Sequence, residues 1–371
     1  MEEKIHMVDL HGQYLKIKPE VDAAIQEVID SSAFIGGPAV QRFATHLSEY
    51  LGGVHVVTCA NGTDALQIAL MSLGLQKGDE VIVPAFTYVA SAEVIALLGL
   101  TPVLVDVDEH TYGIDTEAVR QAITPHTRAV IPVHLFGQSA DMQPLVALAE
   151  EYGLHIVEDN AQAIGATYHG KLTGTIGNIG CTSFFPSKNL GCFGDGGAIC
   201  TADEQLAERL RMIANHGQRK KYHHEITGCN SRLDAMQAAI LDIKLRHLNE
   251  YNEARSKAAA RYDRLLSATP LVLPAIAPDR THVYHQYTVR VPNGQRDALR
   301  EYLAARDIPS MVYYPLPLHH QPAFARTSRM AGRLDTSERL CQEVLSLPMH
   351  TELTETQQTH IAQAIYKFYN I

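Results

Sequence analysis

Lys188 is the side chain in this sequence that is best placed for covalent chemistry. It follows a run of apolar and small residues at 181–185, which predicts a buried strand that Pro186 ends. A glycine-rich stretch at 191–197 comes next, so the lysine is expected on a loop whose neighbours leave room for a ligand. Burial there would lower the pKa of its ammonium group and free the amine to attack a carbonyl carbon, as a Schiff-base lysine must. A solvent-exposed loop lysine is the commoner alternative.

Three further side chains that follow predicted strands would bind a pyridoxal phosphate beside that lysine. Asp159 ends a buried segment at 154–158, and a buried carboxylate needs a partner such as a protonated pyridine nitrogen. Gln162 would hydrogen-bond the phenolic oxygen of the ring, and Tyr88 would stack on its face. A helix cap for Asp159 and a core position for Tyr88 are the plainer alternatives. The joint order of these residues along the chain favours the cofactor.

The phosphate of such a cofactor would bind where a predicted strand ends at residue 59 and turns into a helix. Gly62 and Thr63 lie in that turn, and free backbone N–H groups at the start of a helix attract anions. The hydroxyl group of Ser183 would complete the site. An ordinary helix cap by Asn61 or Thr63 is the commoner alternative.

The elements that position these residues alternate between short apolar runs and helical periods from 54 to 158. This alternation predicts a mostly parallel sheet that helices cover on both faces. Ligands bind such sheets at the carboxyl ends of the strands, where the segments described above would converge. A polar arm at 216–232 and then an α+β pattern follow, so we expect a large domain at 1–248 and a smaller one at 249–371.

Composition argues against several other classes of protein. The 371 residues carry a formal net charge of -10 and no basic run, so nucleic acid is not an expected partner. The N-terminus lacks the apolar core of a signal peptide, and the longest apolar run, 94–105, is too short to span a membrane. Six cysteines without a CxxC pair indicate reduced thiols in the cytoplasm, and nineteen histidines without an HExxH motif predict no metal.

Two glycine-containing segments imitate nucleotide-binding motifs. Residues 165–172 resemble a P-loop, but Leu172 stands where a Ser or Thr would bind magnesium, so a polar hairpin is the better interpretation. Residues 191–197 do not satisfy GxGxxG and do not open a dinucleotide-binding βαβ unit. Neither segment therefore indicates a nucleotide-hydrolysing or NAD-dependent enzyme.

The joint pattern resembles the DegT-like family of sugar-nucleotide aminotransferases, which are pyridoxal phosphate enzymes of fold type I. This resemblance covers essentially the whole chain, with Asn160 standing where the family usually has a smaller residue. It implies an α/β fold with a mostly parallel seven-stranded sheet flanked by helices, plus a smaller C-terminal α+β domain. The segments that carry it include Asn61-Gly-Thr-Asp-Ala-Leu66, Pro84-Ala-Phe-Thr-Tyr-Val89, Glu158-Asp-Asn-Ala-Gln162, Ser183-Phe-Phe-Pro-Ser-Lys188 and Asn230-Ser-Arg-Leu-Asp234.

The resemblance also implies a role for individual residues. Lys188 would hold the cofactor as a Schiff base and shuttle the proton, with Asp159 on the pyridine nitrogen. Asn230 would reach the cofactor phosphate from the neighbouring subunit, which implies an obligate homodimer with shared active sites. The residues that would line the sugar-nucleotide pocket are Phe34, Arg232, Tyr313, Tyr314 and His319.

The implied reaction has two halves, in which L-glutamate aminates the cofactor and the amino group then passes to a keto sugar linked to UDP or dTDP. Within the family, the chain is most similar to the branch that aminates UDP-2-acetamido-3-keto-glucuronic acid for bacterial surface polysaccharides. A dTDP-keto-6-deoxyhexose aminotransferase is the alternative. A sugar dehydratase is disfavoured because those enzymes replace the lysine with histidine. A non-catalytic regulator is disfavoured because Lys188 and the cofactor residues are all present.

Overall fold

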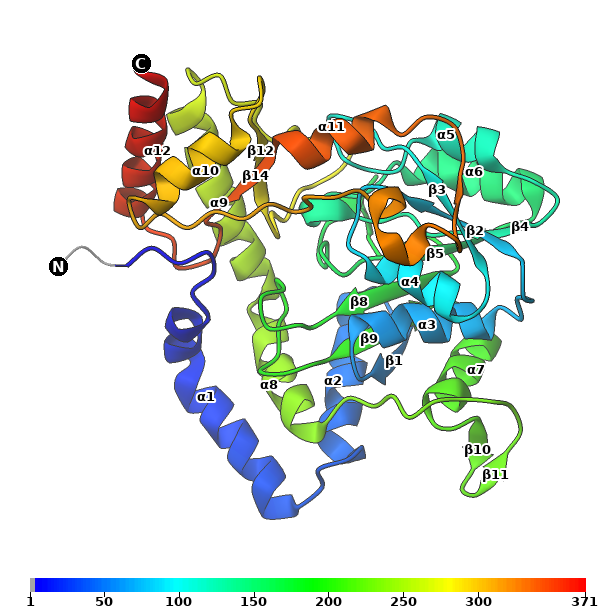
Figure 1. Cartoon of the computed structure of the whole chain (residues 1–371). Coiled ribbons are helices and arrows are strands. Elements are labelled where there is room, and N and C mark those ends of the chain that lie inside the picture. Colours follow the sequence, from blue (N-terminus) through cyan, green and yellow to red (C-terminus); the bar gives the residue numbers. More distant parts are fainter. Residues whose placement is uncertain (1–3) are drawn as a thin grey trace.

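An eight-stranded sheet forms the centre of the computed structural model, which describes residues 4–371 (Figure 1). From one edge to the other its strands are β1 (His55–Cys59), β9 (Gly197–Thr201), β8 (Ile179–Ser183), β5 (His155–Asp159), β4 (Thr127–Val130), β2 (Glu80–Pro84), β3 (Thr101–Val105) and β13 (Arg329–Met330). Every neighbouring pair from β8 to β13 is parallel, whereas β9 runs antiparallel to both β1 and β8. The predicted mostly parallel sheet is therefore confirmed.

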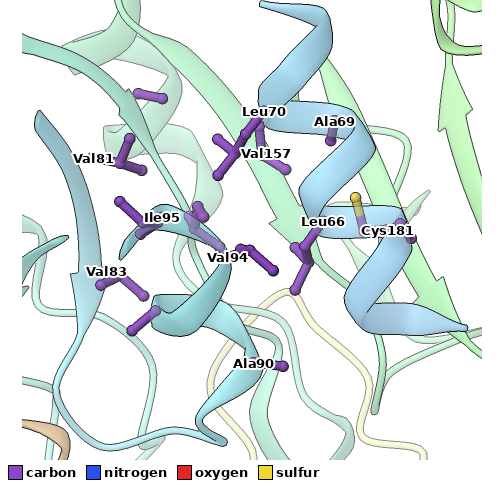
Figure 2. Packing of buried hydrophobic residues seen from close by; sticks show 14 of the residues in the cluster. Leu66, Ala69, Leu70, Val81, Val83, Ala90, Val94, Ile95, Val157 and Cys181 are labelled. Carbon is purple, nitrogen blue, oxygen red and sulfur yellow. The ribbon is translucent and has the colours of Figure 1, made fainter. Parts of the chain in front are cut away.

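Helices cover both faces of this sheet. One face carries α3 (Gly62–Ser72), α4 (Ala90–Leu97) and α7 (Glu204–Ala214). The other carries α5 (Thr116–Ala122), α6 (Met142–Tyr152), α2 (Gly37–Tyr50) and α8 (Ala235–Arg246). Successive side chains of β2 point to opposite faces of the sheet, so Val81 and Val83 pack with α3 and α4 while Ile82 packs with α5 and α6. This alternation accounts for one layer of helices on each face. Figure 2 shows the first of these layers, with Leu66 and Leu70 of α3 facing the strand residues.

The C-terminal part of the chain builds a second core of its own. Its elements are α9 (Leu248–Leu266), β12 (Tyr287–Arg290), α10 (Arg296–Ala304), α11 (Asp335–Glu343), β14 (Val344–Leu347) and α12 (Glu355–Tyr369). β12 and β14 pair antiparallel, and Tyr262, Val289 and Ile361 are buried together between them and the helices. The predicted boundary at 248/249 falls where α8 gives way to α9, and it stays a prediction.

Residues 311–334 lead back from this C-terminal part to the large sheet. They contain the short helices η2 (Leu318–His320) and η3 (Pro322–Phe324) and then β13, which pairs with β3. Arg329 in β13 donates to both carboxylate oxygens of Glu80 in β2, at 2.8 and 3.0 Å. Seven strands come from residues 55–201, as the resemblance implied, and β13 is an eighth. Two residues are too few to show a periodicity, so this strand left no signal in the sequence.

One long helix, one short helix and two hairpins complete the fold. Helix α1 (Leu10–Ser31) packs along α8, and η1 (Leu135–Gly137) follows β4. The predicted polar hairpin is present as β6 (Thr167–Tyr168) and β7 (Lys171–Leu172), and the polar arm forms a second, exposed hairpin of β10 (Gln218–Lys220) and β11 (His223–His224). Within residues 4–371, we find no helix that combines the length and the apolar character needed to cross a membrane.

Candidate active site

Lys188 lies on the loop that leaves the carboxyl end of β8, as predicted. Its backbone N–H donates to the carbonyl oxygen of Phe185 at 2.8 Å, which closes a turn behind Pro186. Burial lowers the pKa of Lys188 to about 8, although the nearby charge of Asp159 acts in the opposite direction. About a tenth of the lysine is therefore a neutral amine at pH 7 and about half at pH 8, and a nucleophile and proton carrier requires this neutral form.

Two contacts from other elements hold this loop in place. The side-chain amide of Asn189 donates to Asn252 Oδ1 at 2.8 Å and to the carbonyl oxygen of Val283 at 2.9 Å. Lys244 of α8 is fully buried and donates from Nζ to the carbonyl oxygen of Gly191 at 2.5 Å. The loop is thus fixed from the C-terminal part on one side and from α8 on the other.

Asp159 is the last residue of β5 and is almost fully buried. Ser91 Oγ donates to its Oδ2 at 2.8 Å, and the backbone N–H of Ala161 donates to its Oδ1 at 3.1 Å. A carboxylate with two donors keeps further lone pairs free, so Asp159 can still accept from a ligand. Ser91 was missed in the sequence because it lies in α4, 68 positions away from its partner.

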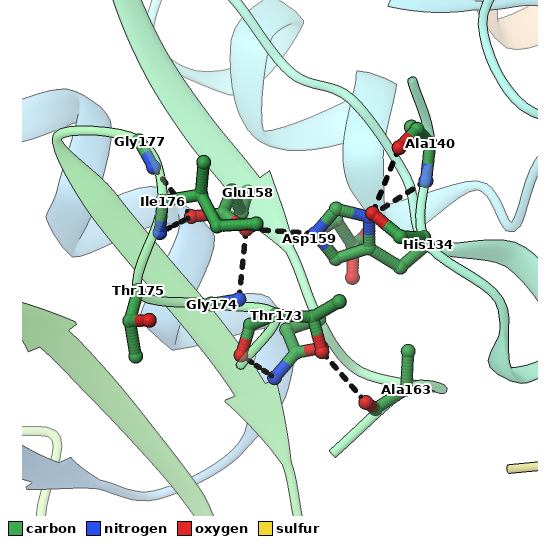
Figure 3. Close-up of polar contacts among 12 residues, drawn as sticks. His134, Ala140, Glu158, Asp159, Ala163, Thr173, Gly174, Thr175, Ile176 and Gly177 are labelled. Atoms are coloured by element: carbon green, nitrogen blue, oxygen red, sulfur yellow. Dashed lines mark hydrogen bonds and ion pairs between the residues drawn. The ribbon is translucent and has the colours of Figure 1, made fainter. Parts of the chain in front are cut away.

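The neighbouring carboxylate of Glu158 is fully buried and points away from Asp159 into a ring of donors (Figure 3). The backbone N–H of Ala140 donates to His134 Nδ1 at 3.1 Å, so the proton of this neutral ring lies on Nε2. His134 Nε2 then donates to Glu158 Oε2 at 2.8 Å. The remaining donors are the backbone N–H groups of Gly174, Ile176 and Gly177, at 2.8, 2.7 and 2.6 Å. Glu158 therefore anchors the strand end, and only Asp159 is left for a ligand.

Gln162 is held between two elements. The backbone N–H of Phe136 donates to its Oε1 at 2.8 Å, and its Nε2 donates to the hydroxyl group of Tyr314 at 3.0 Å. Tyr88, by contrast, is more than half exposed, and its ring centroid lies 6.0 Å from that of Tyr314. The amide is thus rigidly placed, while the aromatic face of Tyr88 is open to a ligand.

The start of α3 provides the predicted anion site. Asn61 caps the helix by accepting from the backbone N–H of Asp64 at 2.8 Å, so the alternative interpretation as a cap is correct for this residue. The N–H groups of Gly62 and Thr63 have no acceptor within the helix, because the first turn of any helix lacks one. A Cβ on Gly62 would lie 2.6 Å from Ser183 Cβ, so only glycine lets α3 and β8 approach this closely. Capping and anion binding are therefore compatible here.

These segments enclose a cavity of about 830 Å³. The predicted residues that line it are Gly62, Thr63, Tyr88, Asp159, Gln162, Ser183, Lys188, Tyr313 and Tyr314. Residues that the sequence did not single out also line it, among them Thr87, Asp195, His285 and Gln286. His285 is buried, and this burial together with the charges of Lys188 and Arg255 holds its pKa well below the usual value. A neutral imidazole therefore faces the lysine.

Four predicted residues lie outside this cavity. Asn230, Arg232 and Phe34 are exposed, and the carbonyl oxygen of Phe34 accepts from Ala235 at the start of α8. His319 pairs with Glu338 at 3.0 Å instead. The roles predicted for these four residues stay predictions.

The prediction that no metal is bound also stays a prediction. One cluster, His319, His320 and Glu338, brings three possible ligand atoms within 4.8 Å of one another. Its nitrogen–oxygen distances of 3.0 and 3.4 Å show that both imidazole rings contact the carboxylate directly.

The cavity fits pyridoxal phosphate in each of its parts. A lysine amine is available for the aldehyde carbon, a held carboxylate for the pyridine nitrogen, and the second N–H of the Gln162 amide for the phenolic oxygen. The helix start and Ser183 offer donors for the phosphate group.

Comparison with known proteins agrees with this fit. The sequence model of the DegT/DnrJ/EryC1/StrS aminotransferase family matches residues 15–366. The chain belongs to this family.

Several relatives of the chain match over almost its whole length. A Geobacillus stearothermophilus protein named as a pleiotropic regulatory protein is 48% identical over 98% of both chains. The UDP-2-acetamido-2-deoxy-3-oxo-D-glucuronate aminotransferase of Pseudomonas aeruginosa is 47% identical over 94% of this chain and 96% of its own. A dTDP-3-amino-3,4,6-trideoxy-alpha-D-glucose transaminase of Streptomyces venezuelae is 46% identical over 98% of this chain and 95% of its own.

Among solved structures, Streptomyces venezuelae DesV in complex with a ketimine intermediate superimposes with a TM-score of 0.95, at 45% identity over 99% of each chain. The predicted α/β fold of type I and the predicted aminotransferase activity are confirmed. The enzyme uses pyridoxal phosphate as its cofactor.

Proposed function

We propose that this aminotransferase moves the amino group of L-glutamate onto the keto carbon, C3 in the favoured case, of a nucleotide-linked sugar. The observation that carries the proposal is the single cavity in which Lys188, with a pKa of about 8, faces Asp159 and Gln162. An amine that is partly neutral near pH 8 can both accept and return a proton. The same cavity therefore serves the donor and the acceptor in turn.

Pyridoxal phosphate supplies, when bound, a ring that takes up the electron pair left on the α-carbon of the donor. With the cofactor bound, the Nζ atom of Lys188 would take the proton from that carbon and pass it to the cofactor, and in the second half of the reaction it would move a proton from the cofactor to the former keto carbon. Positioned proton transfer of this kind contributes typically about 10² to 10⁴ in rate. Lys188 is thus the group that both halves of the reaction share.

The carboxylate of Asp159 would accept a hydrogen bond from the protonated ring nitrogen of the bound cofactor and so favour that protonated form. Ser91 and Ala161 donate to this carboxylate and fix its direction. Gly62, Thr63 and Ser183 would bind the phosphate group, and the exposed ring of Tyr88 would stack on the cofactor ring. These contacts hold the cofactor at both ends while Lys188 is released from it.

A charge imbalance in the cavity favours a shared active site. The lining contains one lysine, Lys188, against the carboxylates of Asp64, Asp159 and Asp195. Glutamate and a sugar diphosphate add several negative charges. We therefore propose a homodimer in which the partner subunit's Arg232 supplies positive charge to this cavity and the partner subunit's Asn230 reaches the phosphate. The exposure of Arg232 and Asn230 in the single chain supports this arrangement.

The proposed acceptor is a UDP-linked 2-acetamido-3-keto-glucuronate, and a dTDP-linked keto-6-deoxyhexose is the alternative. Relatives of both kinds match the chain almost equally well. Synthesis of bacterial surface polysaccharide, in the cytoplasm, is the proposed setting.

The test follows the visible absorbance of the protein loaded with pyridoxal phosphate. L-Glutamate should bleach the band of the lysine-bound cofactor, and the correct keto sugar should restore it. Lys188→Ala, the matched variant, should show no such band. If the absorbance band of the wild-type protein persists after glutamate is added, the assignment of glutamate as the amino donor is wrong. If glutamate bleaches the band and no member of a panel of UDP- and dTDP-linked keto sugars restores it, the proposed class of acceptor is wrong.

The shared site has its own test in mixed dimers. Lys188→Ala and Arg232→Ala are each expected to be inactive. Random mixing of the two should recover about a quarter of the wild-type activity, because half of the dimers then contain one intact site of two. No recovery in mixtures shown to exchange subunits would place Arg232 in its own subunit's site.

Transfer of ¹⁵N from labelled glutamate to a sugar product tests the proposed transfer directly, because a protein that only bound the two compounds would yield no labelled product.

A further inference from the structure

The hydrogen bonds around Gln162 fix which end of its amide is which. A backbone N–H can only donate, so the atom that accepts from Phe136 at 2.8 Å is the oxygen, Oε1. The opposite atom, Nε2, carries two N–H groups. One of them donates to the hydroxyl oxygen of Tyr314 at 3.0 Å. The second finds no acceptor within residues 4–371, and Gln162 lines the cavity.

Tyr314 is suited to hold that amide. Burial raises the pKa of its hydroxyl group far above the usual value, so the group remains a neutral phenol that accepts through its oxygen. Its ring is packed between aromatic neighbours, at 6.1 Å from Phe86 and 6.0 Å from Tyr88 between centroids. An acceptor fixed in this way directs the first N–H of Gln162, and thereby the second.

Tyr314 also joins parts of the chain that are far apart. It lies 152 positions beyond Gln162, in the segment 311–316 that β14 anchors through backbone bonds between Met311 and Ser346. Through one side chain the C-terminal part therefore contacts both Gln162 and Tyr88, the two residues expected beside the cofactor ring.

We propose that Tyr314 is a positioning residue, which acts through Gln162 to aim an N–H group at the phenolic oxygen of the bound cofactor. This inference rests on the proposed roles of Gln162 and Lys188. It differs from the role in sugar binding that the resemblance implied for Tyr314. Tyr314 needs no contact with substrate to affect the reaction, because the protonation of the cofactor depends on the hydrogen bonds to its ring oxygen.

The experiment compares Tyr314→Phe with Tyr302→Phe, a half-buried tyrosine of α10 outside the cavity. Two quantities are measured besides activity: the pH midpoint at which the absorbance of the lysine-bound cofactor changes, and the dissociation constant of the cofactor. Loss of one hydrogen bond should weaken cofactor binding roughly fivefold and move the midpoint by several tenths of a pH unit. Tyr302→Phe should leave both quantities at their wild-type values.

A double-mutant cycle with Gln162→Leu decides whether Tyr314 acts through the amide. In the Gln162→Leu background, Tyr314→Phe should change neither readout further. An equal effect of Tyr314→Phe with and without Gln162 would overturn the proposal, as would wild-type readouts in the single variant. Should Tyr314→Phe fail to fold, Tyr314→Leu or Tyr314→Met takes its place in the same cycle, because each also removes the hydroxyl group that accepts from Gln162.

The same experiment distinguishes a failure of the proposed function from a failure of the positioning role alone. If the wild-type protein forms no band with pyridoxal phosphate, or Lys188→Ala keeps the wild-type band, the assignment of the cofactor site fails. If the wild-type band forms and only the Tyr314 comparison is negative, the positioning role alone fails.

Discussion

The depressed pKa of Lys188 predicts that this residue destabilises the cofactor-free protein at neutral pH. The pKa falls from 10.5 to about 8 on folding because the ammonium group is buried. Each pKa unit corresponds to 1.36 kcal/mol, so the charged lysine costs about 3 kcal/mol wherever it is protonated in both states. Lys188→Met fills a similar volume without a charge, and it should therefore stabilise the cofactor-free protein at pH 7.

The sign of the pH dependence follows from proton binding. Between pH 8 and 10.5 the unfolded chain still carries the proton and the folded chain has lost it. Stability rises with pH wherever the unfolded state binds more protons, so the penalty shrinks as the pH increases through this window. From pH 7 to pH 10 the wild-type protein should gain about 2.5 kcal/mol relative to Lys188→Met.

The assay is urea unfolding of the two cofactor-free proteins at equal protein concentration, at half-unit steps from pH 7 to 10. Lys171→Met in the β6–β7 hairpin is the matched control, since Lys171 is exposed to solvent and its removal should show no such trend relative to wild type. A difference between wild type and Lys188→Met that stays constant within about 0.5 kcal/mol over this range would refute the reasoning.

Three further substitutions test other contacts of the site. Gly62→Ala places a Cβ 2.6 Å from Ser183 Cβ, so α3 must shift; cofactor affinity should fall at least tenfold in equilibrium dialysis, and the free energy of unfolding by about 1–3 kcal/mol. Glu158→Gln turns an amide NH₂ toward backbone N–H donors and should cost about 3 kcal/mol in urea unfolding, whereas unchanged stability would contradict the buried ion. Asp159→Asn should lower kcat by about 10² to 10⁴ while changing cofactor occupancy much less, and full activity would remove its role.

The sequence predicted the parts of the site that depend on local order. Asp159 is the last residue of β5, and Gly62 and Lys188 lie shortly after the ends of β1 and β8. A parallel sheet brings the ends of its strands to one edge wherever the strands lie in the chain. Residue type and position after a strand were therefore sufficient to assemble them. The same reasoning gave the polar hairpin at 165–172, whose turn is also local.

What the sequence did not predict are contacts between distant positions. Ser91 holds Asp159 from α4, and Tyr314 holds Gln162 from the C-terminal part. Neither serine nor tyrosine carries a pattern that marks such a partner, because the contact depends on how helices and the second core pack on the sheet. His285 was missed for the same reason. Asn230 and Arg232 act, as proposed, across a subunit boundary that a single chain does not contain.

Strand β13 is synthesised long after the strand that it pairs with, so one edge of the sheet stays unpaired while the chain is being made. When the ribosome has made the first 248 residues, β3 is the last strand of the sheet, and the backbone groups that later pair with Arg329 and Met330 are open. Open edges of this kind pair readily with other chains. About 80 more residues must be translated before β13 can pair with this edge of β3, which takes about 4–16 s at ribosomal elongation rates. The nascent chain is therefore most exposed to aggregation during this interval, and a fragment ending at residue 248 should self-associate.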